Sequence, residues 1–338
     1  MKRRELLLGL PLLHPTLSRL EQGGDAKAPF VQTVRGPVPA SELGLTLAHE
    51  HVLVDFVGAD RVSPDRYSID EAYRVALPHL QEAKRLGTRT IFECTPAYLG
   101  RDPRLLRRLA EASGVNLVTN TGYYGANNDK HVPVHAYRES ASKLAARWTA
   151  EARGGIDGTG IRPGFIKSGV DAGRLSEIDR KLVTAAARCH LDTGLTIAVH
   201  TGDGAAALDI LAVLETERVD PAAYVYVHAQ NARDRAVQAQ VAAAGAWVEL
   251  DGIAPDSLEG YVEAVLDLAG RGHLGRLLVS HDAGWYHVGE PGGGSYRGYG
   301  LLFESFVPSL LKRGLSEKDV RTLLVGNPAR AFSGYRQA

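Results

Sequence analysis

The chain has 338 residues, of which 39 are basic and 39 acidic, and 44% of all residues are hydrophobic. This length is enough for a large core in one domain, and the balanced charge argues against nucleic acid or a membrane surface as a partner. Two cysteines are too few for a disulfide framework, and no apolar run in the sequence is long enough for a membrane-spanning helix.

The first 28 residues differ from the rest of the chain. Arg3 and Arg4 lead into a short apolar stretch that Pro11 interrupts, and the sequence A-K-A follows at residues 26–28. This order is similar to an export signal with a twin-arginine start and an A-x-A cleavage site. We therefore expect residues 1–28 to direct the protein to the periplasm or out of the cell. The alternative is an N-terminal extension of a cytoplasmic protein.

From about residue 43 onward, short β-like runs alternate with helical patterns. In chain order, the eight runs are Thr46–Val54, Thr90–Cys94, Asn116–Thr119, Gly164–Ser168, Thr196–His200, Tyr224–His228, Trp247–Leu250 and Leu277–Ser280. Between them, apolar residues recur at three- and four-residue spacing, which is typical of a helix with one buried face. Several helices are expected to end at glycines just before the next run, at Gly87, Gly114, Gly194 and Gly245.

This alternation predicts the architecture of residues 29–338. Strands that alternate with helices favour a parallel sheet, and eight repeats favour closure of that sheet into a barrel. The expected fold class is therefore α/β, a single (β/α)8 TIM barrel. Two connections, residues 119–164 and 282–301, are long. Both leave the carboxyl ends of their strands, where loops build binding pockets in such barrels.

Potential metal ligands stand at the ends of five of these runs: His49, His51, Lys167, His200, His228 and Asp282. His49 and His51 are two residues apart, so in a strand they point to one face while Glu50 points away. Imidazole and carboxylate are ligands that zinc, manganese, cobalt or iron accept. Each side chain alone also fits a structural role, as a packed histidine or, for Asp282, a helix N-cap. Their shared position at one barrel rim favours a metal site at the carboxyl ends of the strands.

Lys167 follows two apolar residues inside an expected strand and would lie near the metals. An ammonium group there would be desolvated and repelled by the cations, which favours the neutral amine. A neutral amine can add carbon dioxide and become a carbamate that bridges two metals. The alternative is a lysine paired with a neighbouring acid, and the residues alone leave both open.

At this point the chain resembles a known family, the phosphotriesterase family with its phosphotriesterase-like lactonases, within the amidohydrolase superfamily. The resemblance runs from Val31 to Phe332, and its most specific segments are LAHEHV, YLGRDP, NTGYYG, GFIKSG, SHD and VGNPAR. It implies a barrel with two divalent metals per chain, with zinc expected and cobalt, manganese or iron as alternatives. In the implied scheme, carbamylated Lys167 (N6-carboxylysine) and a hydroxide bridge the two metals. The more buried metal is bound by His49, His51 and Asp282, and the other metal is bound by His200 and His228.

The resemblance also implies a reaction, the metal-assisted hydrolysis of small-molecule lactones, esters or organophosphate triesters. In this reaction, Asp282 would accept the proton after the hydroxide attacks. An amidase that acts on cyclic amides or N-acyl compounds is an alternative within the superfamily, and a barrel that binds metal without turnover is another. Because relatives often pair through barrel faces, a homodimer is the default expectation.

Tyr124, in the TGYYG segment, bears on the substrate. It matches the tyrosine that lines the pocket and hydrogen-bonds the bridging hydroxide in lactonase-like members, which favours a lactone or related ester. The alternative is a ring packed at the base of the loop. Trp285, Tyr286 and His287 follow the last strand and are expected to form an apolar pocket wall with polar handles. Arg297, in the same loop, either orients a substrate carbonyl or carboxylate or is solvated.

The segment after the seventh run, ELDGIA, departs from the lactonase pattern. Gly252 stands where lactonase-like members usually carry an arginine, which argues against acyl-homoserine lactones as the preferred substrate. The preceding residue, Asp251, either assists proton removal or caps the next helix.

Overall fold

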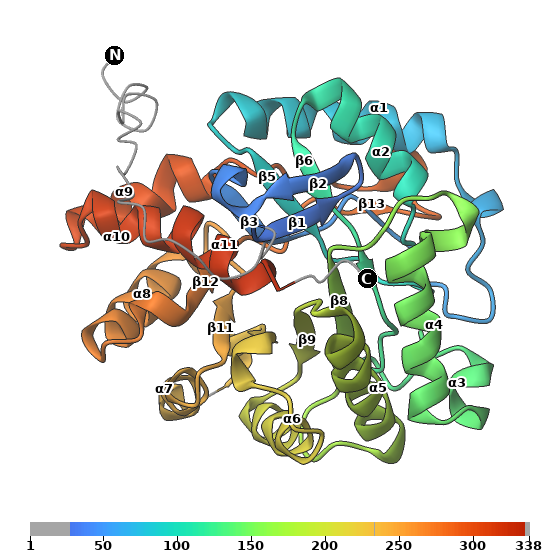
Figure 1. The fold of residues 1–338 in the computed structure, drawn as a ribbon. Helices are drawn as coiled ribbons and strands as arrows, with labels where there is room; N and C mark the ends of the chain where they lie inside the picture. Colours follow the sequence, from blue (N-terminus) through green and yellow to red (C-terminus); the bar gives the residue numbers. More distant parts are fainter. Residues whose placement is uncertain (1–27, 233, 335–338) are drawn as a thin grey trace.

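A computed structural model describes residues 28–232 and 234–334 of the chain (Figure 1). Apart from Ala28, the expected export signal therefore lies outside the described residues. Within them, no helix has the length and apolar character that crossing a membrane requires.

Parallel strands form the centre of the molecule and helices surround them (Figure 1). The strands of the ring are β3 (Thr46–Glu50), β5 (Thr90–Glu93), β6 (Asn116–Val118), β7 (Asn120–Thr121), β8 (Phe165–Val170), β9 (Ile197–Thr201), β10 (Tyr224–Val227), β11 (Trp247–Leu250) and β12 (Leu277–Val279). They pair in chain order, as β3-β5-β6 and as β7 through β12. β6 and β7 are two parts of one barrel strand, separated by Thr119.

The ring closes between the last strand and the first. The backbone N–H of Asp282 donates to the carbonyl of His49 at 3.2 Å, and the N–H of His49 donates to Ser280 Oγ at 3.1 Å. Eight strand positions in chain order, each followed by helix, make the expected α/β TIM barrel, and this prediction is confirmed.

The surrounding helices begin and end at residues suited to those positions. They are α1 (Ile69–Arg85), α2 (Pro103–Ser113), α3 (Val134–Arg138), α4 (Ala141–Gly154), α5 (Glu177–Thr193), α6 (Gly204–Thr216), α7 (Arg235–Ala243), α8 (Leu258–Gly270), α9 (Val307–Lys312), α10 (Glu317–Arg321) and α11 (Asn327–Phe332), with π-helical turns at Leu302–Phe306 and Thr322–Gly326. Ser68 and Ser176 cap α1 and α5 through their side chains. Gly114 and Gly194 end α2 and α5 in the left-handed conformation, as expected.

The interior of the barrel is arranged in layers because alternate residues of a strand face the same side. Nearest the amino ends lies an apolar cluster that includes Phe92, Phe165, Ala198, Trp247 and Leu278, and Phe332 of α11 stacks on Phe92 with ring centroids 4.0 Å apart. Two residues further along three of these strands stand Lys167, His200 and Glu249. The polar layer therefore lies nearer the carboxyl ends of the strands, where the site was expected.

The first expected strand, Thr46–Val54, is shorter than predicted. β3 ends at Glu50, and β4 (Leu53–Val54) leaves the barrel to pair with β13 (Tyr286–His287). The reason lies in long-range contacts, since the N–H of His51 donates to the carbonyl of Ala283 and the N–H of Val52 donates to the Glu93 carboxylate. An antiparallel hairpin of β1 (Phe30–Thr33) and β2 (Gly36–Pro39) was not anticipated, and Val31 of this hairpin joins the apolar cluster at the barrel's amino end.

Candidate metal centre

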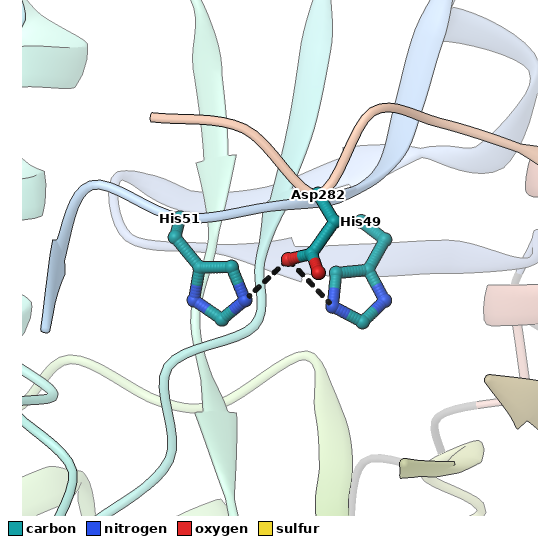
Figure 2. A group of neighbouring side chains, drawn as sticks. All are labelled: His49, His51 and Asp282. Carbon is teal, nitrogen blue, oxygen red and sulfur yellow. Dashed lines mark ion pairs between the residues drawn. The ribbon is translucent and has the colours of Figure 1, made fainter. Parts of the chain in front are cut away.

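His49, His51 and Asp282 converge at the carboxyl rim (Figure 2). Asp282 Oδ1 lies 3.1 Å from His51 Nε2 and 3.7 Å from His49 Nε2. Both imidazoles are buried, and the Asp282 side chain is 25% exposed. We call these three residues the first ligand group, and their spacing allows one cation to reach all three side chains.

The backbone at Asp282 has an unusual conformation that makes this convergence possible. Asp282 has a φ of 52°, in the left-handed region, so no helix begins there and the N-cap alternative does not apply. Gly284, two residues later, has a φ of 99°, and a Cβ added to it would lie 1.8 Å from the carbonyl oxygen of His51. A glycine is therefore required where this segment presses against the end of β3.

The other three expected ligands are Lys167, His200 and His228, which we call the second ligand group. The rings of His200 and His228 have centroids 4.4 Å apart, and the His228 centroid lies 5.0 Å from that of His49. His228 reaches this position with a φ of 58°, just beyond the end of β10. Lys167 stands opposite Ala198 in the pairing of β8 with β9, and Ala198 precedes His200 by two residues, so Lys167 and His200 come from neighbouring strands.

Two buried polar atoms of the centre lack hydrogen-bond partners among the described residues, Lys167 Nζ and Asp282 Oδ1. No acid forms an ion pair with Lys167 in the described part of the chain, so the alternative of a lysine paired with a neighbouring acid is not observed. A buried polar atom without a partner typically costs about 1–3 kcal/mol. Two such atoms, beside four imidazoles, fit residues whose remaining partner is a cation or a covalent modification.

The protonation state of two of the histidines, His51 and His200, also suits metal binding. Burial lowers the pKa of His51 to about 4, and burial together with His228 and Lys167 lowers the pKa of His200 well below its ordinary value. Both rings are therefore neutral at neutral pH, which is the form that binds a metal. His49 differs, because the Cys94 sulfur and the Asp251 carboxylate outweigh the effect of burial and raise the pKa of His49.

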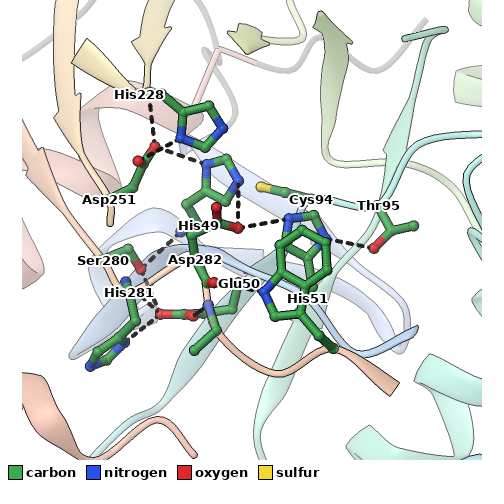
Figure 3. Close-up of polar contacts among 12 residues, drawn as sticks. His49, Glu50, His51, Cys94, Thr95, His228, Asp251, Ser280, His281 and Asp282 are labelled. Carbon is green, nitrogen blue, oxygen red and sulfur yellow. Dashed lines mark hydrogen bonds and ion pairs between the residues drawn. The ribbon is translucent and has the colours of Figure 1, made fainter. Parts of the chain in front are cut away.

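Two buried acids of the β11 region, Glu249 and Asp251, orient the imidazoles from behind. Asp251 accepts hydrogen bonds from His228 Nδ1 at 2.6 Å and from the His228 N–H at 3.0 Å (Figure 3). It also accepts one from Gln230 Nε2 at 2.7 Å. His49 Nδ1 lies 3.1 Å from Glu249 and 3.2 Å from Asp251. Carboxylates in this position fix the tautomer of a ligating histidine and leave its other nitrogen for the metal.

Sequence reasoning did not find these roles. Asp251 does not cap the next helix, because α8 begins after Ser257. Glu249 was not singled out at all. The signal was present, since Glu249 stands two residues after the inward-facing Trp247 and therefore shares its face of the strand.

The expected pocket residues Tyr124 and Trp285 lie on two different sides of the centre, and His287 lies further out. The Tyr124 ring lies 5.1 Å from the His200 ring, and a Cβ at Gly169 would come within 2.6 Å of the tyrosine. Trp285 covers the other side, with its ring centroid 4.2 Å from that of His51. His287 stacks beside Trp285 at 5.9 Å.

The expectation for Tyr286 needs correction, whereas Arg297 is exposed, as in the solvated alternative. Tyr286 is buried and packs in the outer hydrophobic core, because strand alternation turns it away from its neighbours Trp285 and His287. Arg297 donates to the backbone carbonyls of His281 and Asp282 and so holds the chain that carries the ligand. Phe56, which was missed, stacks on Trp285 at 5.7 Å.

Comparisons with known proteins point to one family, and the similarity extends along nearly the whole chain. A model of the phosphotriesterase family matches residues 29–332. The phosphotriesterase homology protein of Escherichia coli is 30% identical over 294 residues, covering 86% of this chain and 98% of the relative. The N-acetyltaurine hydrolase of Tetraodon nigroviridis is 26% identical, covering 88% and 96%. The structure of an organophosphorus hydrolase from Deinococcus radiodurans superimposes with a TM-score of 0.80 at 28% identity, covering 91% and 100%.

Proposed function

Because this chain belongs to the phosphotriesterase family, we propose that it is a binuclear metal-dependent hydrolase of lactones, esters or organophosphate triesters. The family is hydrolytic, depends on two metals and acts on small molecules. The observation that carries the proposal is the convergence of His49, His51 and Asp282 in a barrel mouth that also holds the unpartnered Lys167. Loss of a ligand would have favoured a binding barrel without turnover, and the full set is present.

Each residue of the centre has a distinct task in the proposed reaction. When bound by these residues, two divalent cations would make a hydroxide nucleophile available at neutral pH and would polarise the carbonyl or phosphoryl oxygen of the substrate. Lys167, carbamylated by carbon dioxide, would hold the two cations side by side. Asp282 would bind one cation and then accept the proton of the nucleophile on its carboxylate. Burial would raise the pKa of Asp282, but the nearby imidazoles of His51, His49 and His228 outweigh it, so that the pKa is lowered and the carboxylate stays ionised.

We propose two metals per chain, with zinc as the native metal and cobalt, manganese or iron as alternatives that the same ligands accept. Elemental analysis of the purified protein tests this directly. A content near two equivalents per chain supports the proposal, whereas a metal-free protein that cannot be loaded would contradict it.

The pocket supports a lactone or related ester as the substrate class. Burial raises the pKa of Tyr124, so its hydroxyl stays protonated and can donate a hydrogen bond at the reacting centre. A Cβ at Gly252 would lie 2.2 Å from the hydroxyl of Tyr261. The position of the lactonase arginine is therefore filled by another side chain, which argues against acyl-homoserine lactones.

Amide hydrolysis is the second candidate, and two observations favour it: a relative named for hydrolysis of N-acetyltaurine spans nearly the whole chain, and the lactonase arginine is absent. A panel of lactones, aryl esters, phosphotriesters and N-acyl compounds, given to cobalt- or zinc-loaded protein grown with bicarbonate, separates the candidates. Turnover of esters or lactones supports the first proposal. Turnover of amides alone would replace it with the second.

For residues 1–28 we propose export by the twin-arginine route, supported by the order of charged, apolar and small residues in the sequence. Changing both Arg3 and Arg4 to lysine should leave the protein in the cytoplasm, which cell fractionation would show. We also propose a homodimer, and a monomeric mass by light scattering at working concentration would contradict it.

A further inference from the structure

We propose that Glu50 is a positioning residue that fixes the backbone of the Asp282 segment and so sets the geometry of the first ligand group. The inference rests on the proposed function, since it concerns how a ligand of that centre is held. Glu50 is the last residue of β3 and stands between His49 and His51 in the sequence. It is fully buried and faces away from both imidazoles. It carries no ligand atom for the centre.

The Glu50 carboxylate accepts hydrogen bonds almost entirely from the segment Ser280–Ala283 (Figure 3). Oε1 accepts from Ser280 Oγ at 2.8 Å, from the His281 N–H at 3.1 Å and from His281 Nδ1 at 2.6 Å. Oε2 accepts from the Ala283 N–H at 2.8 Å. The two backbone donors come from the residues on either side of Asp282.

This arrangement accounts for the strained backbone at Asp282. Asp282 has a φ of 52°, in the left-handed region that a non-glycine residue disfavours. Residues around such a position can turn their N–H groups toward one anion and form a concave binding site for it. Here the anion is the Glu50 carboxylate, and the N–H groups of His281 and Ala283 converge on it. The bound carboxylate therefore offsets the strain and holds Asp282 in the turn.

The same contacts direct the neighbouring side chains. His281 is turned outward, where its Nε2 accepts the N–H of Leu302 at 2.9 Å, so this histidine does not enter the centre. Ser280 Oγ donates to Glu50 and accepts the N–H of His49, which ties the segment to the first ligand of the group. Asp282 is left to point inward at His51.

A purely structural role for Glu50, as part of the barrel seam, makes a different prediction. It would lower the free energy of unfolding of the metal-free and metal-loaded protein equally. A positioning role lowers metal affinity as well, and only at the first ligand group. The reason is that, in the described residues, the hydrogen bonds of the Glu50 carboxylate all go to the Ser280–Ala283 segment and none goes to the second ligand group.

The test is Glu50→Gln in the full-length chain. The amide keeps one acceptor oxygen but presents N–H donors to the remaining backbone or side-chain donors. We expect one of the two zinc affinities, measured by chelator competition, to fall about 10- to 100-fold while the other changes little. The visible spectrum of the cobalt-loaded protein should change in the same variant, because the coordination at one cation is altered.

The control is Glu151→Gln, which removes the carboxylate paired with the buried Arg101, away from the ligand segment. It should lower thermal stability but leave both zinc affinities within about twofold. If Glu50→Gln does not fold, Ser280→Ala removes one of the four contacts and should lower the same affinity several-fold. Unchanged zinc affinities and an unchanged cobalt spectrum in a folded Glu50 or Ser280 variant would overturn this inference alone. A wild-type protein that binds no zinc would overturn the proposed function with it.

Discussion

At one side of the barrel mouth, Asp282 Oδ1 lies 3.1 Å from His51 Nε2 and 3.7 Å from His49 Nε2. At the other side, His200 and His228 meet only through rings with centroids 4.4 Å apart, and the Lys167 amine has no partner among the described residues. The first ligand group is thus already assembled by contacts within the protein. In the second ligand group, the Lys167 amine has no polar contact in the described residues, whereas Asp282 Oδ1 of the first group, which also lacks a hydrogen bond, lies beside two imidazoles.

The difference follows from what lies behind each group. His51 Nδ1 contacts Thr95 Oγ1 at 2.7 Å, and the Asp282 segment is held by Glu50. Behind Lys167 there is an apolar layer and no acid in contact. We infer that the first group is preorganised, whereas the second, in which Asp251 holds His228, is completed at Lys167 when carbon dioxide and metal bind. The variants below, in order of expected effect, test that contrast.

Replacing Lys167 with alanine should have the largest effect. Without the bridging group, metal content and turnover should fall together, with the rate more than about 100-fold lower, because the chemistry depends on both cations. Short carboxylic acids added to the variant should restore part of the rate. Metal analysis and kinetics measure this, and full occupancy at an unchanged rate would show that no carbamate bridge exists.

Asp251→Asn should weaken metal binding at both ligand groups, because this carboxylate contacts both His49 and His228. We expect both metal affinities to fall by about 10- to 100-fold, as when a carboxylate behind a ligating histidine is lost. Chelator competition reports each affinity. If affinity fell for one metal only, the contact of Asp251 with the histidine of the other group would not contribute to metal binding.

Tyr124→Phe should have a smaller effect that depends on the substrate. The variant removes one hydroxyl beside His200, and one neutral hydrogen bond is worth about 0.5–1.5 kcal/mol, or roughly 2- to 13-fold in rate. The loss in kcat/KM should be larger for a lactone than for a phosphotriester. Equal losses on both substrates would remove the reason for preferring lactones.

The smallest effect on the metal centre itself is expected at Glu93, whose titration changes stability and which accepts the N–H of Val52 just after the first ligand group. Burial raises the pKa of Glu93 from 4.5 to about 7, so the folded state holds this proton more tightly than the unfolded chain does. The free energy of unfolding should therefore fall as pH rises from 4.5 to 7, by at most about 1.4 kcal/mol per pH unit, and level off above.

Glu93→Gln should flatten the dependence of stability on pH in that window, because the amide does not titrate. Urea unfolding at several pH values compares the two proteins. Parallel curves for wild type and variant would show that Glu93 has an ordinary affinity for its proton.

Much of this centre could be predicted from the sequence because its ligands stand at strand ends, and strand ends of a parallel barrel share one rim. Periodicity found the strands, and the spacing of His49 and His51 gave their common face. What was missed depends on contacts distant in the chain. Ser280 and Glu50 are separated by 230 residues, and no local pattern indicates that they meet.

The left-handed backbone of His228 and Asp282 was likewise beyond local prediction, because tertiary contacts hold these residues in a conformation that their own propensity disfavours. The split of the first expected strand has the same origin. Glu249 is different, since the alternation along β11 already placed it inside the barrel. A complete reading of inward positions would have found this acid from the sequence.

The most direct test is a crystal structure of the zinc-loaded protein, grown with bicarbonate, with the metals located by anomalous scattering. We expect two neighbouring peaks, one among His49, His51 and Asp282 and the other beside His200 and His228, with added density on Lys167 between them. A single peak, peaks away from these side chains, or an unmodified Lys167 beside two metals would contradict the account.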